Sequence, residues 1–335
     1  MFDWKWYLRD IKQDKPVKVF SCFSCGGGST MGYKRAGFTV LGNVEIDRDM
    51  NKLYILNQNP KYNYNEDLRE FNRRNDLPEE LFKVDILDGS PPCSTFSLAG
   101  HREDAWGVKK KFREGQKEQT LDDLFFVWLD TVEKLKPRIA IAENVVGLIQ
   151  GNAKGYVNLI VKRFREFDYD VQLFKLNAAF MNVPQTRERV FFIANNQNFP
   201  KLKLNFSERT IPFGEVRSEQ GIPVTGPTMV RYLKHLHPQD LGVGYITKRL
   251  YGKQRCFNHR IIHDYRVAST VTSGGGNIRA YDKMWLSDED IINISTFPQD
   301  YDFDGQRVQY VCGMSVPPNM MANIALEIWN QWLKK

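Results

Sequence analysis

Short apolar runs rich in β-branched residues recur along the first two hundred residues, and they predict strands. The predicted strands are 17–22, 38–46, 84–87, 139–142, 171–176 and 190–194. Between several of them, apolar positions have helical spacing, and the predicted helices are 50–56, 121–135 and 157–167. Strands that alternate with helices are typical of an α/β fold with a doubly wound, mainly parallel sheet. Such folds bind ligands at the carboxyl ends of their strands.

The pattern changes after Ala194. Residues 195 to about 268 are rich in Pro, Gly, Asn and basic residues and have little periodicity, which predicts a small, loop-rich second lobe. A helical pattern resumes at Ser287. Residues 317–335 place apolar side chains at helical spacing after a Pro-Pro start. We expect this last helix to pack against the first domain.

The length and composition fit a globular chain with one large core and one smaller lobe. No apolar run in the 335 residues approaches the roughly 20 needed to span a bilayer. The N-terminal residues mix charges with aromatics and lack the apolar core of a secretion signal. Five scattered cysteines, an odd number, favour a reducing cytosol over a disulfide framework. We therefore expect a cytoplasmic protein without a membrane contact.

The net charge of +7 is concentrated in one segment. Residues 201–260 contain eleven Lys/Arg and four Asp/Glu, and the rest of the chain carries 36 of each sign. Local positive charge of this kind suits a polyanion such as nucleic acid. A solvated basic face would show the same surplus, so charge alone leaves both interpretations open.

A glycine-rich turn follows the first predicted strand. Gly26, Gly27 and Gly28 allow a tight turn and a close approach of the backbone to a ligand. The segment has neither GxGxxG nor a Walker lysine, which disfavours dinucleotide and triphosphate binding. Glu45 and Asp47 follow the second predicted strand, where a carboxylate commonly binds ribose hydroxyls. The arrangement favours a nucleoside cofactor over a purely structural turn.

Two pairs of residues are candidates for a metal or redox site. Cys22 and Cys25 form a CxxC, and His259 and His263 are four residues apart. Neither pair has further ligands at the spacing of a zinc site, and Cys25 lies inside the glycine turn. We therefore expect no metal site.

The segment around Cys93 is the most informative part of the chain. A predicted strand ends at Asp88-Gly89, and Pro91 and Pro92 then restrict the backbone. This rigidity would hold Cys93 at the carboxyl end of a parallel strand, where catalytic groups lie in such folds. The alternative is a buried structural thiol, which is how most free cysteines behave.

Pro91-Pro92-Cys93, followed by Ser-Thr-Phe-Ser, resembles the nucleophile motif of DNA cytosine-5 methyltransferases such as bacterial or phage modification methylases. The family usually has Gln where this chain has Ser94. Further segments resemble the family's motifs in the family's order: residues 23–28 (cofactor loop), Glu45 (ribose), Asp67 (adenine amine), Glu143-Asn144-Val145, Gln185-Thr186-Arg187-Glu188-Arg189 and Gly313-Met314-Ser315-Val316-Pro317. The resemblance leaves mainly 196–268 uncovered.

The resemblance implies a Rossmann-like methyltransferase with a small target-recognition domain. The catalytic, cofactor-binding domain would be 1–195 plus 306–335, and the target-recognition domain 196–305. The implied cofactor is S-adenosyl-L-methionine, which becomes S-adenosyl-L-homocysteine. The implied cofactor-binding residues are Phe23, Gly26, Gly27, Gly28, Glu45, Ile46, Asp67, Leu68, Pro92, Leu124 and Ser315.

The candidate catalytic residues are Cys93, Glu143, Arg187 and Arg189. A thiolate that adds to cytosine C6 makes C5 nucleophilic toward a methyl group, which is covalent catalysis. Glu143, at the end of a predicted strand, would hold the proton that N3 needs, unless it is merely a surface carboxylate. Arg187 and Arg189 alternate along a predicted strand and would share one face, with Arg189 at the cytosine carbonyl. Either arginine has the alternative of being an exposed strand end.

The base must be flipped out of a duplex before a thiol reaches C6. The polar segment 101–120, net basic by two, would clamp phosphates over the flipped base, or is an idle insertion. The chain departs from the family at Leu121-Asp-Asp-Leu124-Phe125, where Arg-Gly is usual before Leu-Phe, and at Met314, where Asn is usual. These departures leave some loop and cofactor contacts undecided.

The expected partner is double-stranded DNA, with a cognate restriction endonuclease in a restriction–modification context, and the architecture needs no second chain, so we expect a monomer. One alternative is a tRNA cytosine-5 methyltransferase of the same fold, and a second is a catalytically silent DNA-binding protein. The basic lobe favours duplex DNA, and the four catalytic candidates together argue against a silent protein. A nicotinamide oxidoreductase is disfavoured because GxGxxG is absent.

Overall fold

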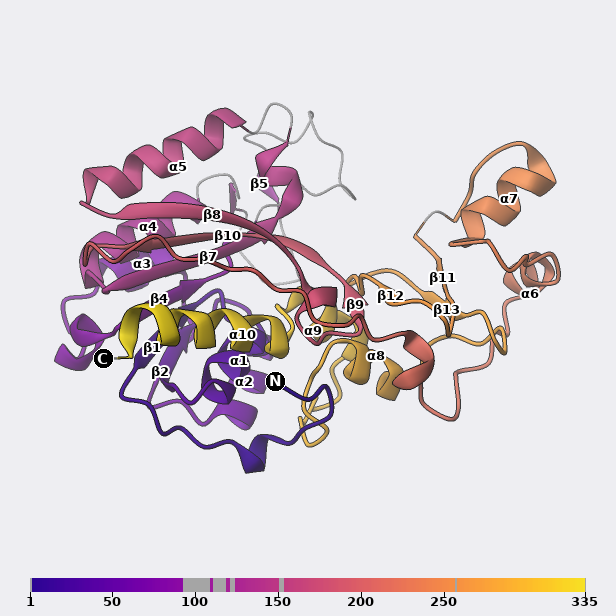
Figure 1. Cartoon of the computed structure of the whole chain (residues 1–335), viewed down its shortest axis with the longest axis horizontal. Coiled ribbons are helices and arrows are strands. Elements are labelled where there is room, and N and C mark those ends of the chain that lie inside the picture. Colours follow the sequence, from indigo (N-terminus) through magenta and orange to yellow (C-terminus); the bar gives the residue numbers. More distant parts are fainter. Residues whose placement is uncertain are drawn as a thin grey trace. The chain divides into compact units, whose positions relative to one another are not determined.

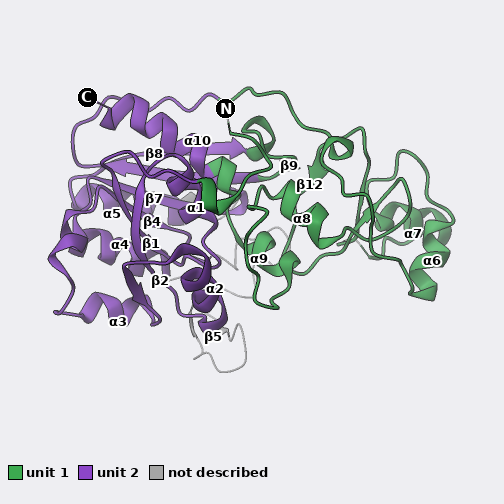
Figure 2. Cartoon of the chain, turned by 90° about the horizontal axis from the view of Figure 1, so that it is seen from below, with its two compact units in different colours: residues 1–10, 178–187, 206–320 green, residues 11–177, 188–205, 321–335 purple. Residues whose placement is uncertain are grey.

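A computed structural model describes residues 2–92, 109–110, 119–120, 124–150, 154–256 and 258–334. The chain divides into two compact units, which Figure 2 colours separately. The first unit comprises 1–10, 178–187 and 206–320, and the second comprises 11–177, 188–205 and 321–335. Cys93 and most of the segment 101–120 lie outside the described residues. The two units are defined by contacts within the chain, whereas the predicted catalytic and target-recognition domains are defined by function. The bounds of those two domains stay a prediction.

The second unit is built on a seven-stranded sheet with the order β3-β2-β1-β4-β7-β10-β8 (Figure 1). The first five strands in this order, β3, β2, β1, β4 and β7, pair in parallel with their neighbours. Strand β10 runs antiparallel to both of its neighbours, β7 and β8. The strands are β1 (Lys18–Cys22), β2 (Thr39–Val44), β3 (Tyr62–Tyr64), β4 (Ile86–Gly89), β7 (Ile139–Val145), β8 (Asp170–Asn177) and β10 (Glu188–Asn195). The doubly wound, mainly parallel sheet and its six predicted strands are therefore confirmed.

Helices cover both faces of this sheet. They are α1 (Gly28–Arg35), α2 (Arg48–Gln58), α3 (Leu68–Arg73), α4 (Leu124–Leu135), α5 (Lys154–Glu166) and the second-unit part of α10 (Pro318–Ile328). The short 3-10 helices of the chain are η1 (Leu8–Asp10), η2 (Glu79–Lys83), η5 (Val146–Ile149), η7 (Ala178–Phe180) and η8 (Phe213–Glu215). A separate antiparallel pair is formed by β5 (Lys109–Lys110) and β6 (Gln119–Thr120). The three predicted helices are present as α2, α4 and α5, within the described residues.

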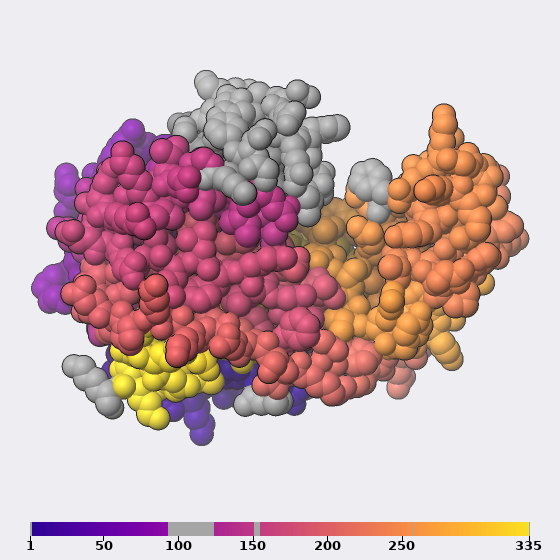
Figure 3. Space-filling model, turned by 45° about the horizontal axis from the view of Figure 1, so that its top comes forward, coloured from indigo at the N-terminus to yellow at the C-terminus, as the bar shows by residue number. Residues whose placement is uncertain are grey.

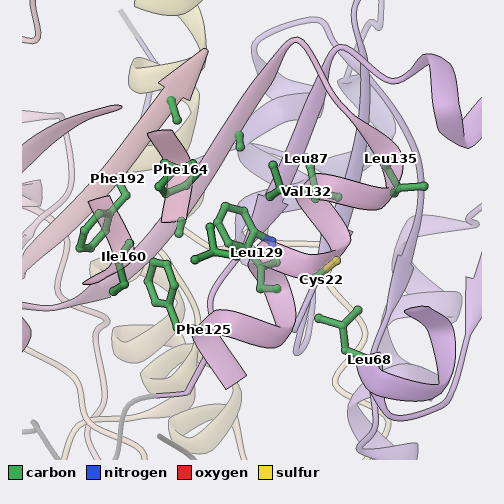
Figure 4. Close-up of a cluster of buried hydrophobic side chains, with 14 of the residues drawn as sticks. Cys22, Leu68, Leu87, Phe125, Leu129, Val132, Leu135, Ile160, Phe164 and Phe192 are labelled. Carbon is green, nitrogen blue, oxygen red and sulfur yellow. The ribbon is translucent and has the colours of Figure 1, made fainter. Parts of the chain in front are cut away.

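The main core of the second unit lies between the sheet and helices α3 to α5. Side chains such as Phe125, Leu129 and Val132 of α4 meet Leu87 and Phe192 of the sheet (Figure 4). Fully burying a side chain of this size contributes roughly 1.5–3 kcal/mol to the free energy of unfolding. This large apolar contact fixes the positions of the strand ends that carry the site.

Gly89, the last residue of β4, allows α4 to approach the sheet closely. A Cβ atom added there would lie 2.3 Å from the Trp128 Nε1 atom, far inside van der Waals contact. Trp128 itself is fully buried in the core. The glycine therefore lets the end of β4 lie close against Trp128 of α4.

The C-terminal segment packs against the second unit, as the sequence predicts. Helix α10 continues into the π-helical turn η9 (Trp329–Leu333), and this yellow segment borders the salmon-coloured chain that follows β10 (Figure 3). The Trp332 indole donates to the Pro200 carbonyl at 2.8 Å and stacks on Phe199 with ring centroids 5.4 Å apart. The sheet and the chain terminus thus share one core.

The first unit is a smaller assembly of short elements. Its helices and strands are β9 (Gln185–Thr186), α6 (Pro227–Leu233), α7 (Val243–Tyr251), β11 (Arg260–Ile262), β12 (Ala268–Ser269), β13 (Asn277–Arg279), α8 (Asp288–Ile294) and α9 (Val308–Met314). The helix predicted from Ser287 is confirmed as α8, which Ser287 caps in a capping box with Asp290. The region 195–268 is not all loop, because it contains the helices α6 and α7 and the strand β11; each is short, and glycine N-caps are weak start signals for the two helices.

Two small parallel pairs, β9–β12 and β11–β13, tie these elements together. A separate apolar cluster, with Val243, Ile246, Ile261 and Ile278, supports α7 on β11 and β13. Nowhere in the described part of the chain is there a helix long and apolar enough to cross a bilayer.

Candidate active site

Glu143 and Arg189 form a buried ion pair near the carboxyl end of β7. The distance between Arg189 Nε and Glu143 Oε1 is 2.7 Å. The side chain of Arg189 is 15% exposed and that of Glu143 is 11% exposed. The pairing follows from the sheet register, in which Phe191 of β10 lies opposite Glu143. Arg189 is therefore the diagonal neighbour of Glu143 on the same face. An arginine held this way orients the carboxyl group and compensates its charge where water is scarce.

Asn144 links the end of β7 to the chain that leads to Cys93. Its Nδ2 donates to the Pro91 carbonyl at 3.1 Å, and its Oδ1 accepts from the Val145 backbone N–H at 2.9 Å. Asn144 is buried, so both hydrogen bonds are shielded from water. The amide therefore fixes the backbone two residues before Cys93, which itself lies outside the described residues.

The glycine-rich turn has the left-handed backbone that its sequence suggests. Gly27 has φ +88° and is the N-cap of α1, and a Cβ there would lie 3.2 Å from the Gln58 Cγ atom. Phe23 and Cys25 also have positive φ angles, 54° and 47°. By the resemblance to cytosine-5 methyltransferases, Cys25 stands where that family has its first loop glycine, and its left-handed backbone is one that glycine adopts without strain.

Glu45 joins this turn to the end of β2. Its carboxylate accepts from the Cys25 backbone N–H at 2.8 Å and from the Asp47 N–H at 2.9 Å. Burial raises the pKa of Glu45 to about 7, against the opposing effect of these two hydrogen bonds. A carboxylate with two oxygens still has lone pairs for the hydroxyl groups of a ligand.

A shallow, open pocket lies at the end of β2, where its lining includes the neighbours of Glu45 on both sides in the chain. Its lining is mainly apolar, with two acids on one side, and consists of Phe23, Val44, Ile46, Glu66, Asp67, Leu68 and Leu124. Most of these are predicted cofactor-binding residues, and sequence reasoning missed Val44 and Glu66. Val44 is the last residue of β2, and Glu66 directly precedes Asp67. Their position beside predicted cofactor-binding residues is the sequence signal that could have identified them.

The two acids of the pocket are held by neighbouring arginines. Asp67 is the N-cap of α3 and accepts from the Arg69 backbone N–H at 2.8 Å. Glu66 pairs with Arg74, with 3.1 Å between Arg74 Nη1 and Glu66 Oε2. These contacts orient both carboxyl groups before any ligand binds.

The remaining predicted cofactor residues lie in several places. Gly26 belongs to the turn, Gly28 is the first residue of α1, and Pro92 follows Pro91 at the end of the described segment. Ser315 belongs to the first unit, where it is the buried C-cap of α9 and donates from Oγ to the Val311 carbonyl at 2.8 Å. Their contribution to a cofactor site stays a prediction.

Arg187 occupies a different environment from Arg189. The strand expected to carry both is interrupted at Arg187, between β9 and β10, so the predicted continuous strand is wrong there. The Arg187 guanidinium donates to the Val271 and Gly313 carbonyls, each at 3.0 Å, within the first unit. Arg187 thus binds backbone carbonyls of that unit, whereas Arg189 binds the Glu143 carboxylate.

Two segments that resemble family motifs, 185–189 and 313–317, meet the chain at Val271 and Thr272 around Arg187. The Val271 N–H donates to Gln185 Oε1 at 3.1 Å, and a Cβ added at Gly313 would lie 2.5 Å from the Thr272 carbonyl carbon. Gly313 is therefore needed for the close approach of two backbones. The contacts fix the chain just before the glycine-rich segment 274–276.

The cysteine and histidine pairs have separate environments. Burial raises the pKa of the Cys22 thiol. His263 Nε2 lies 2.7 Å from the Asp240 carbonyl, and the His259 ring lies against Trp285 at 5.6 Å. Within the described ranges, no three His, Cys, Asp or Glu side chains gather as metal ligands would.

The sequence profile of C-5 cytosine-specific DNA methylases matches residues 17–260. The chain belongs to this family. Similar proteins include the Type II methyltransferase M.FnuDI of Fusobacterium nucleatum, 32% identical over 59% of this chain and 51% of that protein. The orphan methyltransferase M.Rho11sI of Bacillus phage rho11s is 34% identical over 53% of this chain and 32% of that protein. The chain thus matches about half or less of the length of these relatives.

Solved structures place this C-5 methylase chain in the same fold. A candidate DNA modification methyltransferase encoded within an E. coli prophage aligns with a TM-score of 0.66 at 20% identity, over 94% of this chain and 99% of that chain. DNMT2 of Spodoptera frugiperda aligns with a TM-score of 0.63 at 15% identity, over 93% and 99%. At these identities the likeness establishes the Rossmann-like methyltransferase fold.

Proposed function

We propose that this C-5 methylase chain transfers a methyl group from S-adenosyl-L-methionine to C5 of cytosine in duplex DNA. The observation that carries the proposal is the buried Glu143–Arg189 pair beside Asn144, which anchors the chain leading to Cys93. An acid at the carboxyl end of β7, an arginine at the start of the neighbouring β10 and a cysteine that follows β4 in the sequence are the groups that addition to a pyrimidine requires.

The pocket beside the glycine turn fits the proposed cofactor. Phe23, Ile46 and Leu124 offer apolar contacts to an adenine ring, and Asp67 offers an acceptor for its amine. Glu45 would accept hydrogen bonds from the ribose hydroxyl groups. S-adenosyl-L-methionine, when bound there, supplies an electrophilic methyl group.

The protein's own residues would prepare the cytosine. Cys93, as a thiolate, would add to C6, so that the π pair of C5=C6 shifts to C4–C5 and the π pair of C4=N3 moves onto N3. Glu143 donates its proton to N3, which accepts the developing charge, and Arg189 fixes the carboxyl group at that atom. After transfer a base removes the C5 proton, the thiolate leaves C6, and Glu143 recovers its proton.

Arg187, in this proposal, acts mainly by positioning. Its two hydrogen bonds to the Val271 and Gly313 carbonyls would hold the chain just before the glycine-rich segment 274–276 of the first unit. A glycine-rich chain allows a close approach to a nucleic-acid backbone. We therefore place the direct contact to cytosine with Arg189.

Exposed cations of the first unit supply the proposed DNA surface. They lie on α6 and at its C-cap, on α7 and in the loop after α7, orange in Figure 3, and are Arg231, Lys234, Lys248, Lys253 and Arg255. Across the described ranges, none of these five has an acidic side chain within ion-pair distance, whereas Arg209 and Arg249 pair with Glu215 and Asp240. Cations without an acidic partner are the groups that displace counterions from phosphates.

The biological setting completes the proposal. All proposed catalytic groups come from one chain, which supports a monomer, and we place its activity in the cytoplasm. The relatives include both a Type II and an orphan methyltransferase, so the protein would act either beside a cognate restriction endonuclease or alone.

The direct test is transfer of tritiated methyl groups from S-adenosyl-L-methionine to unmethylated duplex DNA, followed by bisulfite sequencing. We expect label at C5 of cytosines in one recurring sequence, and no label on tRNA. Label on tRNA alone would replace DNA by tRNA as substrate. No label on either, with folded protein that binds the cofactor, would favour a silent DNA-binding protein.

A further inference from the structure

Three asparagine side chains form a hydrogen-bonded network beside the glycine-rich turn. They are Asn43 of β2, Asn51 in the first turn of α2 and Asn63 of β3, and we call them the asparagine network. Asn63 Nδ2 donates to Asn43 Oδ1 and to Asn51 Oδ1, each at 2.7 Å. Asn51 Nδ2 donates to Asn63 Oδ1 at 3.0 Å, and Asn43 Nδ2 donates to Asn51 Oδ1 at 3.1 Å. Asn43 and Asn51 are buried, so the centre of the network is shielded from water.

The sheet register and a helix cap bring these three amides together. Asn43 and Asn63 are direct partners in the parallel pair of β2 and β3, so their side chains project from the same face of the sheet. Asp47 caps α2, because its carboxylate accepts from the Met50 N–H at 3.2 Å. This cap fixes the first turn of α2, from which Asn51 reaches the other two amides.

The orientation of each amide in the network is set by its neighbours. Asn51 Oδ1 accepts from both other amides, and the two N–H bonds of Asn43 Nδ2 are used by Asn51 and Ser24. Turning any one amide over would place two NH2 groups, or two oxygens, against each other. Asn43 therefore presents an N–H donor to Ser24 Oγ, at 2.9 Å.

Ser24 lies in the middle of a strained stretch of the glycine-rich turn. It stands between Phe23 and Cys25, two non-glycine residues with φ angles of 54° and 47°. A left-handed backbone is unfavourable for a residue with a Cβ, and it persists only where the surrounding contacts enforce it. Ser24 supplies two such contacts, since its Oγ accepts from Asn43 and its carbonyl accepts from the Gly27 N–H at 2.9 Å.

We propose that the asparagine network holds the glycine-rich turn in the conformation that binds S-adenosyl-L-methionine, so that its three members are positioning residues for the cofactor. The inference rests on the proposed function, in which the turn borders the cofactor pocket. The strained stretch contains Phe23, which lines the pocket, and Cys25, whose N–H donates to the Glu45 carboxylate at 2.8 Å. A turn that relaxed would displace both groups, so loss of the network should weaken cofactor binding.

The test is the Kd for S-adenosyl-L-methionine, measured by calorimetry on Asn43→Ala without DNA. This variant removes the donor to Ser24 Oγ and opens the network at its buried centre. We expect the Kd to rise by about tenfold, the scale of one buried hydrogen bond. The loss should appear in the Kd and KM for the cofactor and not in kcat, because the network does not touch the reacting groups.

Asn195→Ala is the matched control. Asn195 is a buried amide of the same unit, and its Oδ1 accepts from the Gln197 and Phe199 N–H groups at 3.1 and 3.2 Å. It pairs with Ile139, the first residue of β7, and so lies at the opposite edge of the sheet from the turn. We expect a wild-type Kd in this variant, whatever happens to its thermal stability. Equal rises in the two variants, or a wild-type Kd in Asn43→Ala, would overturn the inference.

Cys25→Gly separates positioning of the turn from a general loss of stability. Glycine adopts the left-handed backbone without strain, so the turn should depend less on the network. In the Cys25→Gly background we expect Asn43→Ala to raise the Kd by only about threefold, because the two sites are coupled through Ser24. An equal rise in both backgrounds would mean that the network does not compensate strain in the turn, and would overturn the inference.

Asn63→Ala covers the case in which Asn43→Ala does not fold. Asn63 is exposed on the short strand β3, so its removal should be tolerated. It takes away the donors to Asn43 and Asn51, and the Kd should rise in the same direction by less. A wild-type Kd in this variant would overturn the inference.

Hydrogen–deuterium exchange of the turn distinguishes failure of this inference from failure of the proposed function. If the wild-type protein binds no S-adenosyl-L-methionine, the proposed cofactor is wrong, but exchange still shows whether the network holds the turn. The backbone N–H groups of Cys25 and Gly27 should exchange faster in Asn63→Ala than in Asn195→Ala. Equal exchange in the two variants would overturn the inference.

Discussion

The carboxyl end of the sheet and the α6–α7 region place charge in opposite ways. At the sheet end, Glu143 is buried against Arg189, Asp88 is held by two hydroxyl groups, and Glu45 accepts two backbone hydrogen bonds. On α6 and α7, side chains such as Arg231 and Lys248 are exposed.

The contrast follows from the cost of charge in each environment. A buried charge without partners costs several kcal/mol, so each one is fixed in place, and a fixed group can act on one atom of a substrate. An exposed cation costs little and remains mobile and screened by salt, which suits a polyanion whose sequence it does not read. Changes at the sheet end should therefore lower kcat, and changes on α6–α7 should weaken DNA binding.

The largest expected effect is that of Cys93→Ser. We predict that methyl transfer falls to background, because a hydroxyl is far less nucleophilic than a thiolate at neutral pH. Binding of S-adenosyl-L-methionine, measured by calorimetry, should stay near the wild-type value. Full methyl-transfer activity in this variant would contradict the proposed covalent mechanism.

Glu143→Gln should lower kcat by about 10²–10⁴, the usual contribution of a general acid. Single-turnover methyl transfer measures this loss directly. Glu188→Gln makes the same chemical change at a half-exposed glutamate that pairs with Lys175 on the sheet, and it should leave kcat unchanged. Equal losses in the two variants would remove the special role of Glu143.

A combined Arg231→Ala, Lys248→Ala and Lys253→Ala variant should raise KM for DNA and leave kcat intact at saturating DNA. The slope of log Kd against log salt should fall by about one for each removed cation that neutralises a phosphate. Arg209→Ala is the control, because Arg209 is exposed in the same unit but already paired with Glu215. If the slope of log Kd against log salt equals that of the wild-type protein, the DNA binds a surface other than α6–α7.

The smallest expected effect concerns Glu45 and pH. Its pKa of about 7 means that the carboxylate, which would accept hydrogen bonds from a ribose, becomes protonated as the pH falls below neutrality. We predict that the Kd for S-adenosyl-L-methionine rises by roughly tenfold per pH unit below this pKa. In Glu45→Gln the affinity should be weaker and flat with pH over the same range. Equal pH dependence in both proteins would assign the titration to another group.

The same pKa shift has a defined effect on stability. An acid whose pKa is raised by folding contributes stability below its ordinary value, near 4.5 for Glu45, and loses that contribution as the pH rises through about 7. A charged Glu45 therefore lowers folding stability at the pH where it would bind its cofactor. A bound ribose offsets part of that cost.

The sequence predicts the sheet well because burial on both faces leaves continuous apolar runs, as in Ile139–Ala142 and Val190–Ala194. Strand β3 escaped prediction because it has only three residues, of which Asn63 is polar and exposed. Helices α6 and α7 were not predicted, because each is short and has a glycine as its N-cap, which gives no side-chain cap. Weak local signals of this kind are overridden by tertiary packing.

The candidate site was predictable in its residue types but not in its pairings. The segments containing Cys93, Glu143 and Asp67 are recognisable by motif and by their place after strands. The Arg189–Glu143 and Asn144–Pro91 contacts depend on which strands become neighbours, and no local pattern encodes that order. Arg187 shows the reverse, since a shared motif with Arg189 suggested a shared strand that the fold interrupts.

The most direct test of the central claim is a covalent trap at Cys93. Once bisulfite sequencing has identified the methylated sequence, a duplex with 5-fluorocytosine at that position is incubated with the protein and S-adenosyl-L-methionine. Fluorine cannot leave C5 as a proton does, so the thiol should stay bonded to C6. We predict a protein–DNA complex that survives denaturation, with the modified peptide containing Cys93, and none without the cofactor. Methylation of ordinary DNA without a trapped complex, or a complex at another residue, would contradict the account.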